Sequence, residues 1–164
     1  MTSLIYCTDP KVIKSLFTKY DSKKLGHISM TDLGQLTSDL GFNFDQDELL
    51  ALSMYLDKNS DGNVTLDEFQ QYWIKIASAH ELTVLEKRME LLTQAATMFK
   101  KYDTNANRVL SSDEFEKFYK ELYQHRNDAS MQEVQQAMQG LDLDKNGVIS
   151  FQEFIIWLNW LNLN

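Results

Sequence analysis

A twelve-residue segment that begins with aspartate and ends with a carboxylate residue occurs four times in this chain of 164 residues. The copies cover residues 21–32, 57–68, 103–114 and 142–153, and we number them loops 1 to 4. They read DSKKLGHISMTD, DKNSDGNVTLDE, DTNANRVLSSDE and DLDKNGVISFQE. Such a repeat restricts the fold strongly, because each copy is one structural unit that packs against its neighbours.

Each loop lies between two stretches whose large apolar residues recur at helical spacing. Phe99 and Tyr102 precede loop 3, for example, and Phe115 and Phe118 follow it. Side chains three and four residues apart lie on one face of a helix. With only one proline and six glycines in the chain, helix is further favoured. The sequence therefore predicts an all-α fold of four helix–loop–helix units, with the first helix starting near Pro10.

Loops 2 and 4 carry oxygen-bearing side chains at positions one, three, five, nine and twelve, and glycine at position six. A hard cation such as Ca²⁺ takes six to eight oxygen ligands, which such a loop supplies from these positions and from the carbonyl of position seven. Glycine makes the sharp turn at position six without steric cost. The predicted ligands are Asp57, Asn59, Asp61, Asn63, Thr65 and Glu68 in loop 2, and Asp142, Asp144, Asn146, Val148, Ser150 and Glu153 in loop 4.

This pattern resembles the EF-hand family, the group of calmodulin and troponin C. The resemblance covers nearly the whole chain and implies Ca²⁺ as the ligand, with Mg²⁺ as an alternative occupant in the resting state. It also implies two lobes, in which loop 1 pairs with loop 2 and loop 3 with loop 4 through a short antiparallel β contact at position eight. In the first pair these residues are Ile28 and Val64. The spacing between the lobes does not select a subfamily.

Loop 1 has lost two oxygen donors. Lys23 and Leu25 occupy positions three and five, and the shorter Asp32 stands at position twelve. We therefore predict that loop 1 binds no Ca²⁺. One hypothesis is that the Lys23 ammonium serves as a fixed internal cation for Asp21 and Asp32.

Loop 3 keeps its oxygen donors but has Arg108 at position six. A positive φ at this arginine costs on the order of 1 kcal/mol, and its charge lies near the ion, although the long stem can carry that charge into water. The ligand set of loop 3 also holds two formal negative charges, against three in the ligand sets of loops 2 and 4. We expect it to bind most weakly, and Arg108→Gly to tighten this loop alone. Its predicted ligands are Asp103, Asn105, Asn107, Val109, Ser111 and Glu114.

The stretch between loops 2 and 3 is longer than the spacing within either pair, and it sets the domain organisation. Ser78 and Thr83 each begin an S/T-x-x-E pattern that could cap a helix. We predict a break near Ser78 and a long helix from about Thr83 to Tyr102. The predicted domains are a first lobe of residues 1–79, an inter-lobe linker of residues 80–90 and a second lobe of residues 91–164.

Charge and composition argue against several classes of partner and activity. The net charge of −8 argues against nucleic acid or an anionic membrane as the main partner. The single cysteine, Cys7, cannot form an internal disulfide, and the chain shows no secretory leader and no apolar run of membrane-spanning length, which together favour the cytoplasm. No motif for nucleophilic catalysis or phosphate binding occurs, so we expect no enzymatic activity.

Three functions remain open. A calcium sensor would bind about three ions, open its helix pairs and expose an apolar surface to a helix of a target protein. A calcium buffer would fill the same loops with little helix movement. A constitutive subunit resembling a myosin light chain would clasp a helix regardless of Ca²⁺, and the intact loops 2 and 4 speak against this. We favour a monomeric sensor.

Overall fold

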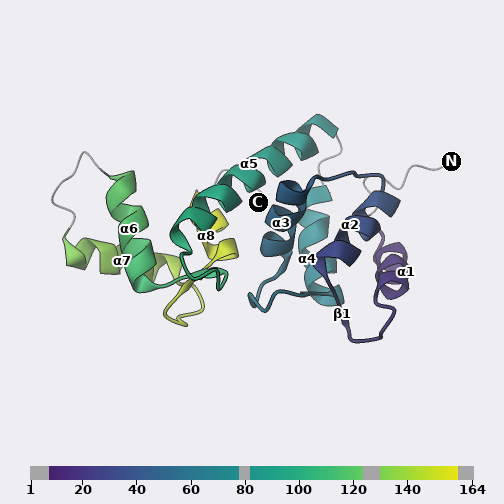
Figure 1. Cartoon of the computed structure of the whole chain (residues 1–164), viewed down its shortest axis with the longest axis horizontal. Coiled ribbons are helices and arrows are strands. Elements are labelled where there is room, and N and C mark those ends of the chain that lie inside the picture. The colour runs from purple at the N-terminus through teal and green to yellow at the C-terminus, as the bar shows by residue number, and fades with distance from the viewer. Residues whose placement is uncertain (1–7, 78–81, 124–129, 159–164) are drawn as a thin grey trace.

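The computed structural model describes residues 8–77, 82–123 and 130–158. Within these residues the fold is all-α with short β contacts, as predicted (Figure 1). No helix in this part of the chain is long and apolar enough to cross a membrane. In chain order the elements are α1 Pro10–Tyr20, β1 His27–Ile28, α2 Met30–Asp39, α3 Gln46–Leu56, β2 Val64–Thr65, α4 Leu66–Ala77, α5 Leu82–Tyr102, β3 Val109–Leu110, α6 Ser112–Leu122, α7 Met131–Leu141, β4 Ile149–Ser150 and α8 Phe151–Leu158.

Antiparallel strand pairs join the loops two by two. Ile28 of β1 lies opposite Val64 of β2, and Leu110 of β3 lies opposite Ile149 of β4. All four are position-eight residues, and their side chains are buried. The pairing predicted between loops 1 and 2 is thus confirmed, and each pair of loops is held together by backbone hydrogen bonds over an apolar contact.

The residues that end a loop also start the next helix. Ser29 and Ser111, at position nine of loops 1 and 3, are the N-caps of α2 and α6. Each forms a capping box with the position-twelve residue, Asp32 or Glu114, in which side chain and backbone bond reciprocally. The predicted start of α1 at Pro10 is confirmed. A change at position twelve therefore acts directly on the first turn of the outgoing helix.

Helix α5 connects the two lobes. It runs from Leu82 to Tyr102, which confirms the long helix predicted from about Thr83. The predicted break near Ser78 lies outside the described residues. The division into residues 1–79, 80–90 and 91–164 stays a prediction, although most of the proposed linker is helical and continuous with the first helix of the second lobe.

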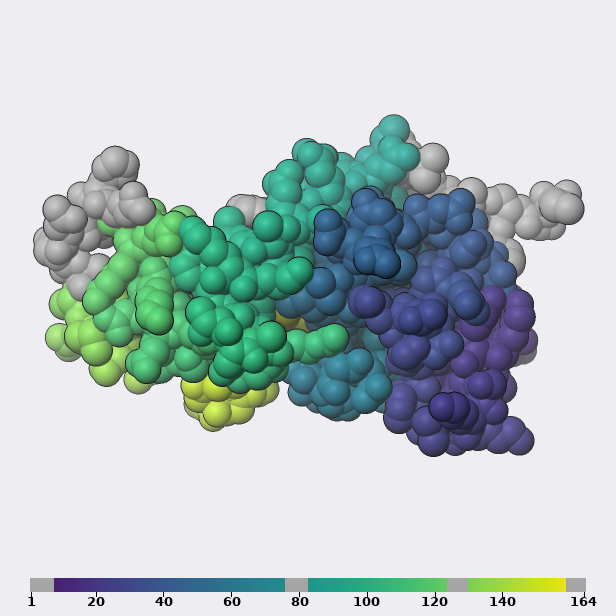
Figure 2. Space-filling view, viewed as in Figure 1, coloured from purple at the N-terminus to yellow at the C-terminus, as the bar shows by residue number. Residues whose placement is uncertain are grey.

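The two lobes pack against each other. The first half of α5 lies along α3, with Leu85, Met89 and Leu92 buried, and α8 also contacts α3. Figure 2 shows the purple and blue atoms of the first lobe next to the green atoms of the second, with teal atoms of α5 along the upper edge between them. Loops 2 and 3, far apart in sequence, are brought close by this packing.

Aromatic side chains fill the core of each lobe. In the first lobe, the Phe69 and Trp73 rings stack with their centroids 5.5 Å apart. In the second, Phe154 packs edge-on against both Phe118 and Phe99, at 5.2 and 5.4 Å between centroids. Such aromatic pairs add to the stabilisation from burial alone, so each lobe has a packed aromatic core.

Candidate metal centre

Loops 2, 3 and 4 share one hydrogen-bond framework. The position-one aspartate accepts from the backbone N–H groups of positions five and six, and the side-chain oxygen of position three also accepts from position five. The oxygen of position five accepts from the N–H of position seven. Loop 3 keeps every one of these bonds despite Arg108. The bonds from position six join Gly62 to Asp57 at 2.8 Å, Arg108 to Asp103 at 2.9 Å and Gly147 to Asp142 at 2.9 Å.

Two backbone positions in every loop are left-handed. At position six Arg108 has a φ of +67°, near the values of the equivalent glycines, as the sequence predicts. Position four is left-handed as well, which the sequence did not reveal. Its residues share no type that would have marked the position: they are Lys24, Ser60, Ala106 and Lys145.

The glutamates at position twelve are buried and held by two other positions of their loops. One oxygen of Glu114 accepts from the N–H and hydroxyl of Ser111, and the other from the N–H and hydroxyl of Thr104, all at 2.9 Å. Burial raises the pKa of Glu114, but these hydrogen bonds outweigh it and lower the pKa to about 2. Glu68 and Glu153 likewise accept from positions two and nine. All three are thus held as acceptors facing their loops.

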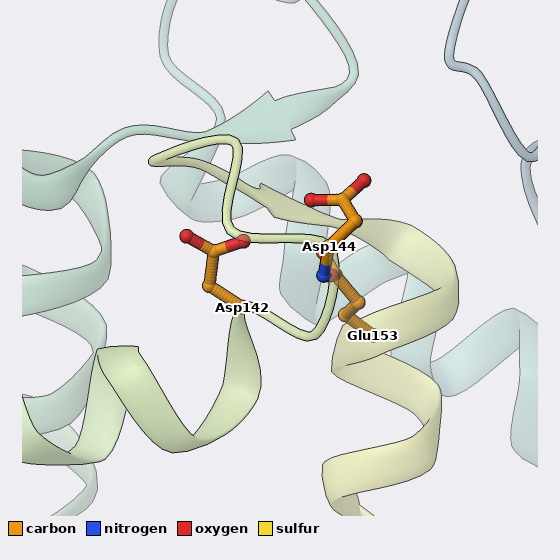
Figure 3. Close-up of side chains that lie close together, drawn as sticks. All are labelled: Asp142, Asp144 and Glu153. Carbon is orange, nitrogen blue, oxygen red and sulfur yellow. The ribbon is translucent and has the colours of Figure 1, made fainter.

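Loop 4 draws its carboxylates closest together. Asp142, Asp144 and Glu153 each offer an oxygen, and these oxygens lie within 4.8 Å of one another. Figure 3 shows them converging from the end of α7, the loop and the first turn of α8. An all-oxygen set fits a hard divalent cation such as Ca²⁺ rather than a metal that prefers nitrogen or sulfur. It is the one such cluster among the described residues.

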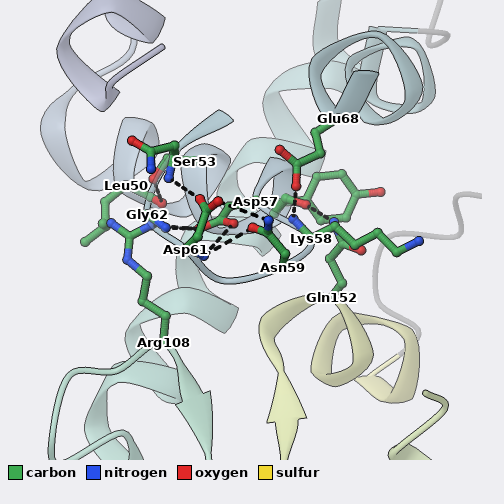
Figure 4. Close-up of polar contacts among 12 residues, drawn as sticks. Leu50, Ser53, Asp57, Lys58, Asn59, Asp61, Gly62, Glu68, Arg108 and Gln152 are labelled. Atoms are coloured by element: carbon green, nitrogen blue, oxygen red, sulfur yellow. Dashed lines mark hydrogen bonds and ion pairs between the residues drawn. The ribbon is translucent and has the colours of Figure 1, made fainter. Parts of the chain in front are cut away.

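Loop 2 differs because its position-one aspartate already has a cationic partner. Arg108 of loop 3 donates from Nη1 to Oδ2 of Asp57 at 3.2 Å (Figure 4). The long stem of Arg108 thus carries its charge to a carboxylate of loop 2, while the side chain stays 31% exposed. Burial raises the pKa of Asp57, while hydrogen bonds from Gly62 and Asp61 and the charge of Arg108 act in the opposite direction. No sequence pattern indicated this contact between lobes.

Loop 1 keeps the turn but lacks the donors. Asp21 accepts from the N–H groups of Leu25 and Gly26, both at 2.8 Å. Lys23 forms an ion pair with neither Asp21 nor Asp32 in the described part of the chain. The hypothesis of Lys23 as an internal cation is therefore wrong for this structure, since backbone amides satisfy Asp21 instead.

The structure places every predicted ligand of loops 2, 3 and 4 on its loop and within the described residues. Their hydrogen bonds show which side chains converge, and five of the ligands are among the few buried polar residues. Their role as metal ligands stays a prediction. The five are Asp57, Glu68, Asp103, Glu114 and Glu153.

Comparison with known proteins agrees with this architecture. The chain is 26% identical over 151 residues to the probable calcium-binding protein CML25 of Arabidopsis thaliana, covering 92% of this chain and 75% of the relative. It is 23% identical over 150 residues to the calcium-binding allergen Ole e 8 of Olea europaea, covering 92% and 82%. It is 21% identical over 144 residues to troponin C, isoform 1, of Drosophila melanogaster, covering 88% of each chain.

A family model described as an EF-hand domain pair matches residues 10–74 and 92–158. The first match contains α1 to β2 and most of α4, together with loops 1 and 2. The second contains the second half of α5, loops 3 and 4, and helices α6 to α8. Because these two regions make up most of the chain, the protein belongs to the EF-hand family.

Proposed function

We propose that this protein is a calcium sensor, which binds about three Ca²⁺ ions in loops 2, 3 and 4 and then presents an apolar surface to a helix of a target protein. The oxygen-only donor sets support the binding of Ca²⁺, as do the names of the relatives, which call CML25 and Ole e 8 calcium-binding. The observation that carries the sensor assignment is an apolar groove on the second lobe.

The groove lies between α5 and α6 and encloses about 650 Å³. Met98, Tyr102, Phe118 and Leu122 provide its apolar lining, and the Leu122 side chain is 48% exposed. An ion pair between Lys101 and Glu121 lies at the groove. A groove with an apolar floor and charged residues around it suits one face of an amphipathic helix, and its methionine can adapt to differing side chains.

The position-twelve glutamates would link ion capture to helix position. When bound, Ca²⁺ supplies a double positive charge that oxygen ligands neutralise. For both oxygens of Glu114 to serve as ligands, the carboxylate must exchange its bonds to Thr104 and Ser111. Because Glu114 lies in the first turn of α6, this exchange acts on a helix that forms one wall of the groove.

A calcium buffer is the second candidate, and one observation favours it. The first half of α5 covers part of the first lobe, where Leu85 and Met89 are almost fully buried. If this packing persists when the loops fill, the first lobe gains no exposed apolar surface. The sensor proposal therefore assigns target binding to the second lobe.

Calorimetry combined with an apolar fluorescent dye separates the two candidates. The sensor predicts uptake of about three Ca²⁺ ions together with new dye binding, and Leu122→Glu should suppress that dye binding while leaving uptake unchanged. As a matched control, Met131→Glu alters a 58% exposed methionine at the start of α7 that does not line the groove, and should leave both readings unchanged. Uptake without dye binding would reject the sensor and favour the buffer.

The wider setting is part of the proposal. We place the protein in the cytoplasm as a monomer without catalytic activity, supported by its single cysteine and by its membership of the EF-hand family. Analytical ultracentrifugation with and without Ca²⁺ tests the monomeric state, which a dimer in both conditions would contradict.

A further inference from the structure

The second lobe holds the start of loop 2 from two sides. From loop 3, Arg108 donates to the Asp57 carboxylate at 3.2 Å, and from loop 4, Gln152 donates from Nε2 to the carbonyl of Tyr55 at 2.5 Å (Figure 4). Tyr55 is in the last turn of α3, and Asp57 is the C-cap of that helix. Position six of one loop thus reaches position one of another, 51 residues earlier.

The Arg108 guanidinium lies against the position-six turn of loop 2. A Cβ placed on Gly62 would stand 3.9 Å from Cζ of Arg108, which is ordinary van der Waals contact. The Asp57 side chain is only 2% exposed and that of Arg108 is 31% exposed. A carboxylate buried to this degree is costly unless it is paired, and Arg108 supplies the positive charge.

The same carboxylate is the predicted position-one ligand of loop 2. A guanidinium in contact with Oδ2 occupies an oxygen that a cation would need, and it places a positive charge beside that cation, where like charges repel. Nothing else in loop 2 departs from the ligand pattern, since its side chains and Gly62 match it throughout. The arginine is therefore the feature that sets loop 2 apart from loop 4.

Resting on the proposed function, we propose that Arg108 is the internal counter-cation of loop 2, which neutralises Asp57 while the loop is metal-free and lowers its affinity for Ca²⁺ by competing for that carboxylate. Arg108 then affects two loops at once. In loop 3 it places a residue with a side chain at a left-handed backbone position, with φ at +67°. In loop 2 it competes with the ion for Asp57.

Two substitutions separate these roles. Arg108→Gln removes the charge but keeps a side chain at the left-handed position, whereas Arg108→Gly also relieves the backbone strain. If Arg108 acts only through strain, Arg108→Gln leaves loop 2 unchanged. If it acts as a counter-cation, Arg108→Gln and Arg108→Gly tighten loop 2 to a similar extent.

The test uses the full chain with loop 2 as its sole intact site, made by Glu114→Gln and Glu153→Gln. Calorimetry then measures the Kd of loop 2 for Ca²⁺, with and without Arg108→Gln. Lys145→Gln is the charge-matched control, because Lys145 also has a positive φ and forms no ion pair with any described residue. We expect Arg108→Gln to tighten loop 2 about fivefold and Lys145→Gln to change it by less than about twofold.

Each outcome decides a different point. An unchanged Kd for Arg108→Gln, in a variant whose circular dichroism shows native helix content, overturns the counter-cation role and leaves the sensor intact. If Arg108→Gln proves misfolded, Arg108→Lys gives the answer, because a retained charge on a shorter side chain should tighten loop 2 less than Arg108→Gly does. A tightened loop 2, together with Ca²⁺ uptake but no dye binding by the native protein, supports the counter-cation role and rejects the sensor. Absence of Ca²⁺ binding to loop 2 in every variant overturns both.

Discussion

Replacement of Leu85 by alanine probes the packing that brings the lobes together. Leu85 is 1% exposed in the first half of α5 and lines a cavity of about 310 Å³ beside Phe42 and Phe44. Truncating a buried leucine to alanine costs about 2–5 kcal/mol. Because Leu85 borders a cavity and is not packed on all sides, truncation removes fewer contacts, and we expect the lower part of this range, about 2–3 kcal/mol, and a fall in Tm of roughly 5–10 °C.

The assay is urea denaturation in calcium-free buffer, since bound Ca²⁺ would add stability by mass action. Val84→Ala is the matched control, because the adjacent Val84 is 41% exposed and should change the free energy of unfolding by less than about 0.5 kcal/mol. We also expect Leu85→Ala to bind the apolar dye without Ca²⁺. A Leu85→Ala protein as stable as Val84→Ala would refute the packing of α5 on the first lobe as a source of stability.

Two further predictions concern ionisation and the order of the sites. Burial raises the pKa of Tyr55 to about 12 from 10.0. The stability that the neutral phenol contributes is therefore fully present below pH 10. It falls by roughly 2 kcal/mol as the pH rises to about 12. Denaturation across this range should show a smaller loss for Tyr55→Phe, and equal losses would count against the shift. Among Glu68→Gln, Glu114→Gln and Glu153→Gln, calorimetry should show the smallest effect on calcium affinity for Glu114→Gln, and the ranking fails if that exchange has the largest.

The sequence predicted those features that depend on local chemistry. The ends of the loops and starts of the helices follow from capping residues such as Ser111 with Glu114, which are also spaced as ligands. The pairing of Ile28 with Val64 follows from apolar residues that recur at position eight. The left-handed turn at Arg108 follows from its place in the repeat.

The missed features depend on contacts between distant segments. Arg108 reaches Asp57 because α3, α5 and α8 pack together, and a long flexible side chain leaves no periodic trace of its partner. The sequence likewise pointed to Lys23 as the internal cation, because Lys23 is adjacent to the carboxylates of its own loop. Charge proximity along the chain was a poor guide here, since backbone amides satisfy Asp21 at lower entropic cost than a lysine side chain.

Native mass spectrometry in dilute Ca²⁺ tests the central claim most directly, because it counts the ions that one folded chain holds. The account predicts three ions on the native protein and two on each of Glu68→Gln, Glu114→Gln and Glu153→Gln, with Asp32→Asn in loop 1 still holding three. A native protein that holds no Ca²⁺, or one that holds a fourth ion lost on Asp32→Asn, would contradict it.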